Sequence, residues 1–168
     1  SPLGPTLANA FLCHYEKIWL KDCPLEFKPV VYRRYVDDIF VLFKSQEHLP
    51  SFVNYMNSKN RNMKFISEYE SSNSFSFLDV KVKRCEDGFS TSVFRKPTFN
   101  GVFTNFDSFI FHSYKIGLIH TLLFRCFTIC SNMKNFHLEI EKLRNIFKSN
   151  NYPAGVIDLS IKTFLNKI

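Results

Sequence analysis

The sequence lacks a run of uncharged apolar residues long enough to cross a membrane, which takes about 18 consecutive residues. Its most apolar stretch, residues 116–130, is interrupted by His120 and Arg125 and is typical of a buried helix instead. The first residues also lack the basic segment and apolar core of a secretory signal. We therefore expect a protein that does not span a membrane and is not secreted.

The sequence has few cysteines, and their spacing contains no paired cysteine motif. The five cysteines form no CxxC pair, and although Cys126 and Cys130 share a helix face, no further His or Cys pair completes a zinc site. The histidines have no metal-ligand spacing, and the sequence has no glycine-rich phosphate loop and no Ser/His/Asp arrangement. We expect reduced and mostly buried thiols, as in an intracellular protein.

Acidic residues are outnumbered by basic ones. The 168 residues include 22 Lys and Arg against 15 Asp and Glu, which gives a net charge of +7 and a pI of about 9.2. This balance favours a polyanion as partner, and both nucleic acid and an anionic membrane surface fit it. A hydrophobic content of 45% is enough for one globular domain, or for a larger lobe with a small satellite.

Apolar periodicity predicts an α+β fold with an all-helical tail. Residues 5–20 have apolar side chains at helical spacing, from Leu7 to Trp19, and Ser45 can cap a second helix over residues 46–59. Alternating apolar residues predict five strands, two between these helices and three between the second helix and the tail. The predicted strands cover residues 30–35, 39–44, 63–70, 74–84 and 89–96. The predicted tail helices cover residues 113–131, 134–149 and 154–167.

The change of pattern after Pro97 predicts a soft domain boundary near residues 97–105. We divide the chain into residues 1–97 and residues 98–168. Within the middle helix of the tail, apolar spacing predicts which side chains face the core. These are Leu138, Leu143, Ile146 and Phe147.

Asp37 and Asp38 stand side by side at the tip of the first predicted hairpin, in the segment YRRYVDDIFVLF (32–43). Two adjacent carboxylates in an apolar surround are costly unless something compensates their charge. A divalent cation does so, and Mg²⁺ binds through one or two carboxylates while keeping sites for water and substrate phosphates. The alternative is a plain solvated turn, where Asp is common.

The residues around this pair resemble a known family. The YVDD segment at 35–38 is similar to the YxDD box of reverse transcriptases, and SPLGPTLANAF (1–11) resembles the segment that follows their first catalytic strand. Three more segments extend the resemblance to the Penelope-like retroelement branch over nearly the whole chain. These are FSFLDVKVKR (75–84), TSVFRKPTFNGVFTNFDSF (91–109) and NNYPAGVID (150–158).

The resemblance implies a partial reverse-transcriptase palm followed by a helical thumb, in which Mg²⁺ and a dNTP serve nucleotidyl transfer. It implies that Asp37 is the main catalytic metal ligand and Asp38 a supporting one. The third carboxylate of the family site belongs to a strand before residues 1–11, so we expect a fragment that binds Mg²⁺ weakly and is inactive alone. The implied partners are an RNA template and a DNA primer, or an RNA–DNA hybrid, in the nucleus or cytoplasm and without a membrane.

Five further residues acquire roles through the resemblance alone. Pro2, Leu3, Gly4 and Pro5 match a loop that lies beside the templating base and the incoming nucleotide. Tyr35 would lie near the primer end. The alternatives are a plain helix-entry loop and an ordinary cross-strand aromatic residue.

A basic strand region would approach the backbone of the primer–template, with contacts that depend on salt and not on sequence. The alternative is a set of solvated charges on an exposed strand face. The region comprises Lys81, Lys83, Arg84, Arg95 and Lys96. Nearby, we expect Leu78 in the core and Asp79 in a turn or at a sheet edge.

The tail, from about residue 105 to residue 168, takes the place of the polymerase thumb, and its three short helices with tight joints also resemble a helix-turn-helix. Its cations would contact phosphates or stay solvated. They are Lys115, Arg125, Lys134, Lys142, Arg144 and Lys148.

Three hypotheses for the function stay open. The chain is a truncated RNA-directed DNA polymerase, a non-catalytic nucleic-acid-binding or interaction module centred on the tail, or a domesticated structural protein.

Overall fold

The computed structural model describes residues 3–70, 73–86 and 88–168. Over these residues the fold is α+β, with two small antiparallel sheets and a helical C-terminal region, as the sequence predicts. The chain forms two compact units, an N-terminal unit (Ser1–Tyr69) and a C-terminal unit (Glu70–Ile168). The domain division expected at residue 97 from the change of sequence pattern stays a prediction.

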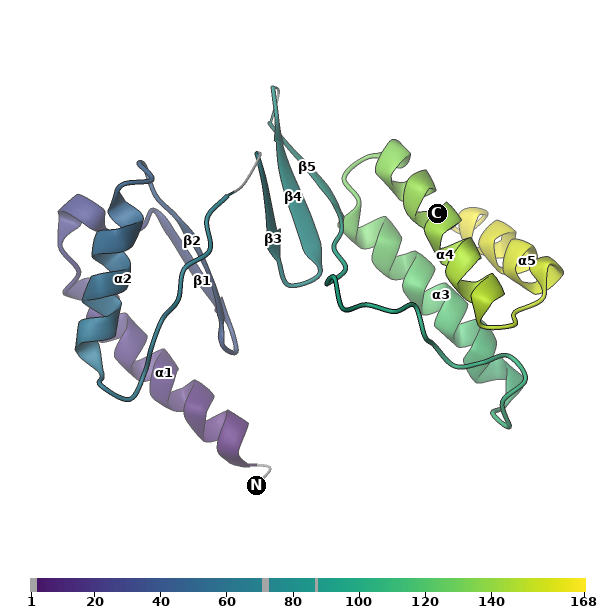
Figure 1. Cartoon of the computed structure of the whole chain (residues 1–168), viewed down its shortest axis with the longest axis horizontal. Helices are drawn as coiled ribbons and strands as arrows, with labels where there is room; N and C mark the ends of the chain where they lie inside the picture. Colours follow the sequence, from purple (N-terminus) through teal and green to yellow (C-terminus); the bar gives the residue numbers. More distant parts are fainter. Residues whose placement is uncertain (1–2, 71–72, 87) are drawn as a thin grey trace. The chain divides into compact units, whose positions relative to one another are not determined.

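In the N-terminal unit, two helices enclose a small core with a β-hairpin (Figure 1). Trp19 of the first helix and Phe52 and Met56 of the second are buried together with Cys23. Burying such side chains stabilises the unit by roughly 1.5–3 kcal/mol each. The elements are α1 (Leu3–Lys21), the 3-10 helix η1 (Leu25–Phe27), β1 (Val31–Tyr35), β2 (Asp38–Leu42) and α2 (His48–Lys59).

Both helices of this unit differ from the prediction at their starts. The expected loop over Leu3, Gly4 and Pro5 is wrong, because α1 already begins at Leu3, and proline is tolerated in a first helical turn where its missing N–H is not needed. Pro2 lies outside the described residues. Ser45 does not cap α2, which begins at His48; its hydroxyl instead accepts a hydrogen bond from the Glu47 N–H at 3.4 Å.

The apolar side predicted for the first helix is mostly exposed. Leu7, Phe11, Tyr15 and Ile18 keep 38–65% of their surface accessible, whereas Trp19 is 7% accessible. Helical spacing therefore located the apolar stripe but not the part of it that the N-terminal unit buries.

The strand predicted over residues 63–70 is wrong, since the structure has no strand there. The side chain of Asn57 holds the backbone of Phe65 instead. Asn57 Nδ2 donates to the Phe65 carbonyl at 3.1 Å, and the Phe65 N–H donates to Asn57 Oδ1 at 2.6 Å. A side-chain amide thus supplies the hydrogen bonds that a neighbouring strand would otherwise provide.

The C-terminal unit begins with a three-stranded antiparallel sheet of β3 (Ser74–Phe77), β4 (Val80–Cys85) and β5 (Gly88–Val93), in that order. The single strand predicted over residues 74–84 is therefore wrong. It is divided by a two-residue turn in which Leu78 has a φ of 54°. Leu78 is exposed and not in the core, while the turn role of Asp79 is confirmed.

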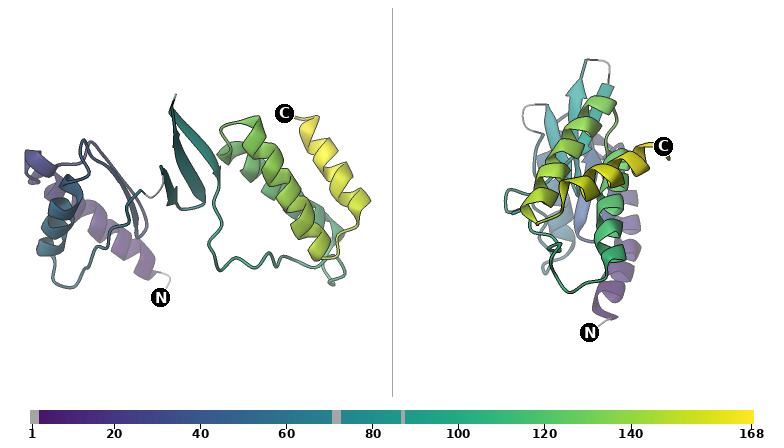
Figure 2. Two further views of the ribbon diagram at one scale, coloured as in Figure 1. Left: turned by 45° about the horizontal axis from the view of Figure 1, so that its top comes forward. Right: turned by 90° about the vertical axis from the view of Figure 1, so that its right-hand side faces the viewer.

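The three tail helices are confirmed as α3 (His112–Ile129), α4 (Met133–Ser149) and α5 (Ala154–Leu165). They pack around one core with Phe136, Leu143 and Phe147 fully buried. Figure 2 shows the segment after β5 running to the far end of α3, which then returns toward the sheet. Leu138, predicted in this core, is 55% exposed, so that part of the prediction is wrong.

Asparagines end and begin the helices of the tail. Asn132 accepts a hydrogen bond from the Asn135 N–H at 2.8 Å and so caps the start of α4. At the other end, Asn151 has a φ of 64°. The Asn151 N–H donates to the Lys148 carbonyl at 3.1 Å and the Tyr152 N–H to the Phe147 carbonyl at 3.0 Å. This pair of bonds is the Schellman motif, which satisfies the last carbonyls of a helix.

Replacing Asn151 by valine is expected to lower the free energy of unfolding of the C-terminal unit by about 1–2 kcal/mol, since left-handed backbone is costly for a side chain with a branched β-carbon. Asn151→Gly is the matched control. It also removes the hydrogen bond from Asn151 Nδ2 to Asp107 Oδ2, but glycine adopts positive φ freely. Denaturant unfolding monitored by circular dichroism compares them. Equal stability of the two variants would show that the backbone conformation at residue 151 is not what stabilises this turn.

Candidate functional site

The paired aspartates lie at the tip of the β1–β2 hairpin. Tyr35 pairs with Asp38 in the last register position, so the turn consists of Val36 and Asp37 alone, and Asp38 is the first residue of β2. Tyr35, Asp37 and Asp38 are thus brought together, and all three are exposed. Within the described residues, no hydrogen bond or ion pair involves either carboxylate.

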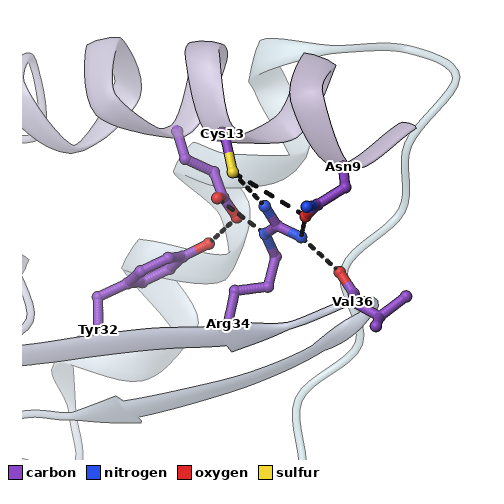
Figure 3. Close-up of polar contacts among 6 residues, drawn as sticks. Asn9, Cys13, Tyr32, Arg34 and Val36 are labelled. Carbon is purple, nitrogen blue, oxygen red and sulfur yellow. Dashed lines mark hydrogen bonds and ion pairs between the residues drawn. The ribbon is translucent and has the colours of Figure 1, made fainter. Parts of the chain in front are cut away.

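A buried ion pair fixes this hairpin to α1 (Figure 3). Arg34 Nε donates to Glu16 Oε2 at 2.8 Å, and the two side chains are only 7% and 9% exposed. The hydroxyl of Tyr32 donates to the other Glu16 oxygen at 2.5 Å. The bond to Glu16 raises the pKa of Arg34, and burial, reinforced by Glu16, raises the pKa of Tyr32.

The same guanidinium reaches the turn itself. Arg34 Nη1 donates to the Val36 carbonyl at 2.7 Å and to Asn9 Oδ1 at 2.8 Å, and Nη2 lies 3.2 Å from Cys13 Sγ. Val36 has a φ of 55°, a conformation that costs a β-branched residue on the order of 1–2 kcal/mol. The Arg34 contacts therefore hold a strained turn in place, with the aspartates projecting from it.

Glu16 was missed by the sequence analysis. It lies between Tyr15 and Lys17 on a helix with an apolar stripe, where an acidic residue is usually solvated. One signal was available: Glu16 precedes the buried Trp19 by three residues, so both share the inward face of α1.

The aspartate pair fits a magnesium ion in donor chemistry but not as a complete cage. Mg²⁺ takes carboxylate oxygens and keeps several waters, so two exposed carboxylates suffice for a weak site. Across residues 3–70, 73–86 and 88–168, no group of three or more His, Cys, Asp or Glu side chains is arranged to hold a metal ion.

The residues predicted to lie beside the incoming nucleotide belong to a helix. Leu3, Gly4 and Pro5 form the first turn of α1 and are exposed.

A second candidate surface is one face of the three-stranded sheet. Directly paired residues of neighbouring antiparallel strands share a face. Lys81 is paired with Ser76 on one side and Ser92 on the other, and Lys83 with Ser74 and Ser90. We call these six residues the serine–lysine face. Both lysines are exposed, and the described part of the chain gives neither an ion-pair partner.

The other three residues of the predicted basic region are used differently. Arg84 pairs with Glu70 at 2.9 Å in an exposed ion pair, which stabilises little. Arg95 pairs with Glu139, whose side chain is 3% exposed, and therefore holds β5 and α4 together. Lys96 is exposed.

Among the tail cations, Lys115 is buried. The two predictions for it, contact with a phosphate and exposure to solvent, are therefore both wrong. Its ammonium donates to the carbonyls of Phe106 and Ser108 at 2.5 and 2.8 Å. Two arginines are engaged with acids, Arg125 with Asp79 at 2.7 Å and Arg144 with Glu141 and Asp158 at 3.4 and 3.2 Å. The exposed lysines of α4 are Lys134, Lys142 and Lys148.

The sequence of the C-terminal helices is similar to a known domain. Residues 102–162 match the animal helix-turn-helix domain. The match includes α3, α4 and most of α5, with the two tight joints between them. No curated protein and no solved structure matches the chain. No helix among the described residues is long and apolar enough to span a membrane.

Proposed function

We propose that the C-terminal unit binds nucleic acid. The observation that carries the proposal is the match of residues 102–162 to the animal helix-turn-helix domain, because helix-turn-helix motifs place a helix against a nucleic-acid groove. Two features support it. The chain has a net charge of +7, and α4 presents Lys134 and Lys148 near its two ends with neither engaged in an ion pair among the described residues.

We further propose that the nucleic acid bound is an RNA–DNA hybrid. We also propose that the chain derives from an RNA-directed DNA polymerase of a Penelope-like retroelement. This rests on the resemblance of residues 35–38, 75–84 and 91–109 to those enzymes. The serine–lysine face supports it, since Lys81 with the hydroxyls of Ser76 and Ser92 beside it offers donors to phosphate oxygens. The exposed Lys83 adds a second ammonium.

A second function is proposed for the aspartate hairpin: metal binding in nucleotidyl transfer by the intact parent polymerase. The exposed tip held by Arg34 supports it. Asp37 and Asp38 would hold Mg²⁺, which when bound neutralises charge on phosphoryl oxygens. The hairpin's own contribution is rigid positioning of the two carboxylates, with Tyr35 beside them. We expect no template-dependent primer extension by this chain alone, because two carboxylates make a weak site.

Fluorescence anisotropy of a labelled RNA–DNA hybrid with the full chain tests the binding proposal. The logarithm of the association constant is expected to fall linearly with the logarithm of the salt concentration between about 50 and 200 mM. Lys134→Gln with Lys148→Gln is expected to lower the slope by roughly two, about one for each phosphate that a lysine no longer neutralises. Lys142 is left unchanged because its ammonium lies 3.6 Å from buried Glu139.

Asp37→Asn with Asp38→Asn is the control for this measurement, and hybrid binding is expected to survive it. The pair Lys81→Gln and Lys83→Gln tests the serine–lysine face in the same way. A slope that neither lysine pair changes would contradict binding through these surfaces. Loss of binding in the aspartate variant alone would instead move the interface to the hairpin.

A further inference from the structure

The C-terminal unit contains a cavity of about 300 Å³ that none of the preceding functions uses. It lies between the chain that follows β5 and the helices α3 and α4. Its apolar walls include Phe99, Phe103, Leu122 and Leu143. This volume is at the lower limit for ligand pockets, so it suits one small ligand and not a larger molecule.

One wall of the cavity is an aromatic ring with firm support. The Phe99 ring is 39% exposed and lies 5.9 Å from the Phe103 ring, which stacks on the buried Phe147 at 6.3 Å. The Arg95 guanidinium lies 5.4 Å from the centre of the Phe99 ring, and its ion pair with Glu139 fixes it there. A rigid, partly exposed ring is a stacking platform for a planar aromatic group.

Positive charge borders the same cavity. Lys96 and Arg125 line it, and Lys96 is exposed with no ion pair in the part of the chain that the structure describes. Arg125 pairs with Asp79, a carboxylate that also lines the cavity and whose side chain is 65% exposed. Such a solvated pair exchanges easily for another anion. The Phe99 N–H donates to the Lys96 carbonyl at 2.9 Å, so the ring and the cation belong to one turn.

We infer that this cavity binds one unstacked nucleotide of a single strand, with its base stacked on Phe99 and its phosphate beside Lys96 and Arg125. The inference rests on the proposed nucleic-acid binding and adds a single-strand site to it. A platform ring beside a cation matches the two chemical parts of a nucleotide, whereas a purely apolar ligand would leave the cations unused.

NMR titration of the ¹⁵N-labelled full chain with a five-residue oligodeoxyadenylate tests this site, with adenosine monophosphate and inorganic phosphate as separate probes. The oligonucleotide and the mononucleotide are expected to shift the amide signals of residues 94–96, 98–99 and 122–126, the oligonucleotide at lower concentration. Phosphate alone is expected to shift them little. Shifts confined to other residues would overturn the site. A mononucleotide that binds when the oligonucleotide does not would overturn the single-strand assignment.

Phe99→Leu, which keeps an apolar side chain but removes the ring, is expected to weaken oligonucleotide binding about tenfold or more. Phe89→Leu is the matched control, since Phe89 is exposed on β5 and does not line the cavity. Lys96→Gln, at an exposed position without an ion pair among the described residues, is expected to weaken binding severalfold. Lys64→Gln in the N-terminal unit is expected to leave it unchanged. Unchanged affinity in both Phe99→Leu and Lys96→Gln would overturn the inference.

The site and the proposed function can fail separately. Hybrid binding through α4 is expected to persist in Phe99→Leu. Hybrid binding without oligonucleotide binding would remove the single-strand site and leave the proposed function. Oligonucleotide binding at the cavity without hybrid binding would retain the site and remove the helix-turn-helix proposal.

Discussion

Glu16→Ala is expected to lower the free energy of unfolding of the N-terminal unit by about 3–5 kcal/mol, the usual cost of removing one partner of a buried ion pair. The variant leaves the Arg34 guanidinium, whose side chain is 7% exposed, without its carboxylate. It also removes the acceptor of the Tyr32 hydroxyl. Because whole domains are stable by only about 5–15 kcal/mol, we expect this loss to remove a large share of the unit's stability.

The measurement is denaturant unfolding followed by tryptophan fluorescence. The chain has one tryptophan, Trp19, which is buried in the core of this unit. Glu26→Ala is the matched control at an exposed glutamate and is expected to change stability by no more than about 0.5 kcal/mol. Replacing both Glu16 and Arg34 by leucine is expected to recover most of the loss. A Glu16→Ala variant as stable as the control would show that the ion pair does not hold the hairpin on α1.

Phe147→Ala is expected to lower the free energy of unfolding of the C-terminal unit by about 3–5 kcal/mol through the cavity that it leaves. The Phe147 side chain is 1% exposed and its ring lies 5.0 Å from Tyr152. Its carbonyl also accepts the Tyr152 N–H in the turn between α4 and α5. The substitution keeps this backbone bond but removes the ring contact with Tyr152, and so loosens both the core and the packing of the joint.

Leu138→Ala is the matched control on the same helix. Apolar spacing predicted Leu138 in the core, but 55% of the residue is exposed, so a change within about 0.5 kcal/mol is expected. Circular dichroism at increasing denaturant compares the two variants. If Leu138→Ala cost as much as Phe147→Ala, the position of α4 on α3 and α5 would be wrong.

The tail helices could be predicted because several local signals agree. Apolar residues recur at helical spacing in each segment, and Asn132, Asn150 and Pro153 mark the joints. The capping hydrogen bond of Asn132 and the positive φ of Asn151 are the physical reasons for two of these signals. Such short-range effects are readable from a sequence.

The two hairpin turns show why the sheet was predicted less well. Val36 and Leu78 have nearly the same positive φ, 55° and 54°, and each is followed by an aspartate. An apolar residue at positive φ is not a recognised turn signal, because glycine or asparagine normally takes that place. The first turn was found through its paired aspartates, while the second was hidden inside an apparently continuous strand.

Candidate site residues depend on partners far away in the sequence, which no local pattern contains. Arg95 and Lys115 appeared as free cations, yet one pairs with buried Glu139 and the other donates to backbone carbonyls. Lys81 and Lys83 kept their predicted exposure because strand alternation alone places them on the face opposite Val80 and Val82. The cavity beside Phe99 forms only when α3 and α4 pack against the chain after β5, so no sequence pattern predicts it.

Photocrosslinking of a bromouridine-labelled RNA–DNA hybrid to the full chain, with the joined peptides identified by mass spectrometry, tests most directly where nucleic acid binds. Crosslinks are predicted within residues 102–162 and on the neighbouring sheet, and they are predicted to decrease in Lys134→Gln with Lys148→Gln. Crosslinks confined to residues 3–69 would contradict binding by the C-terminal unit.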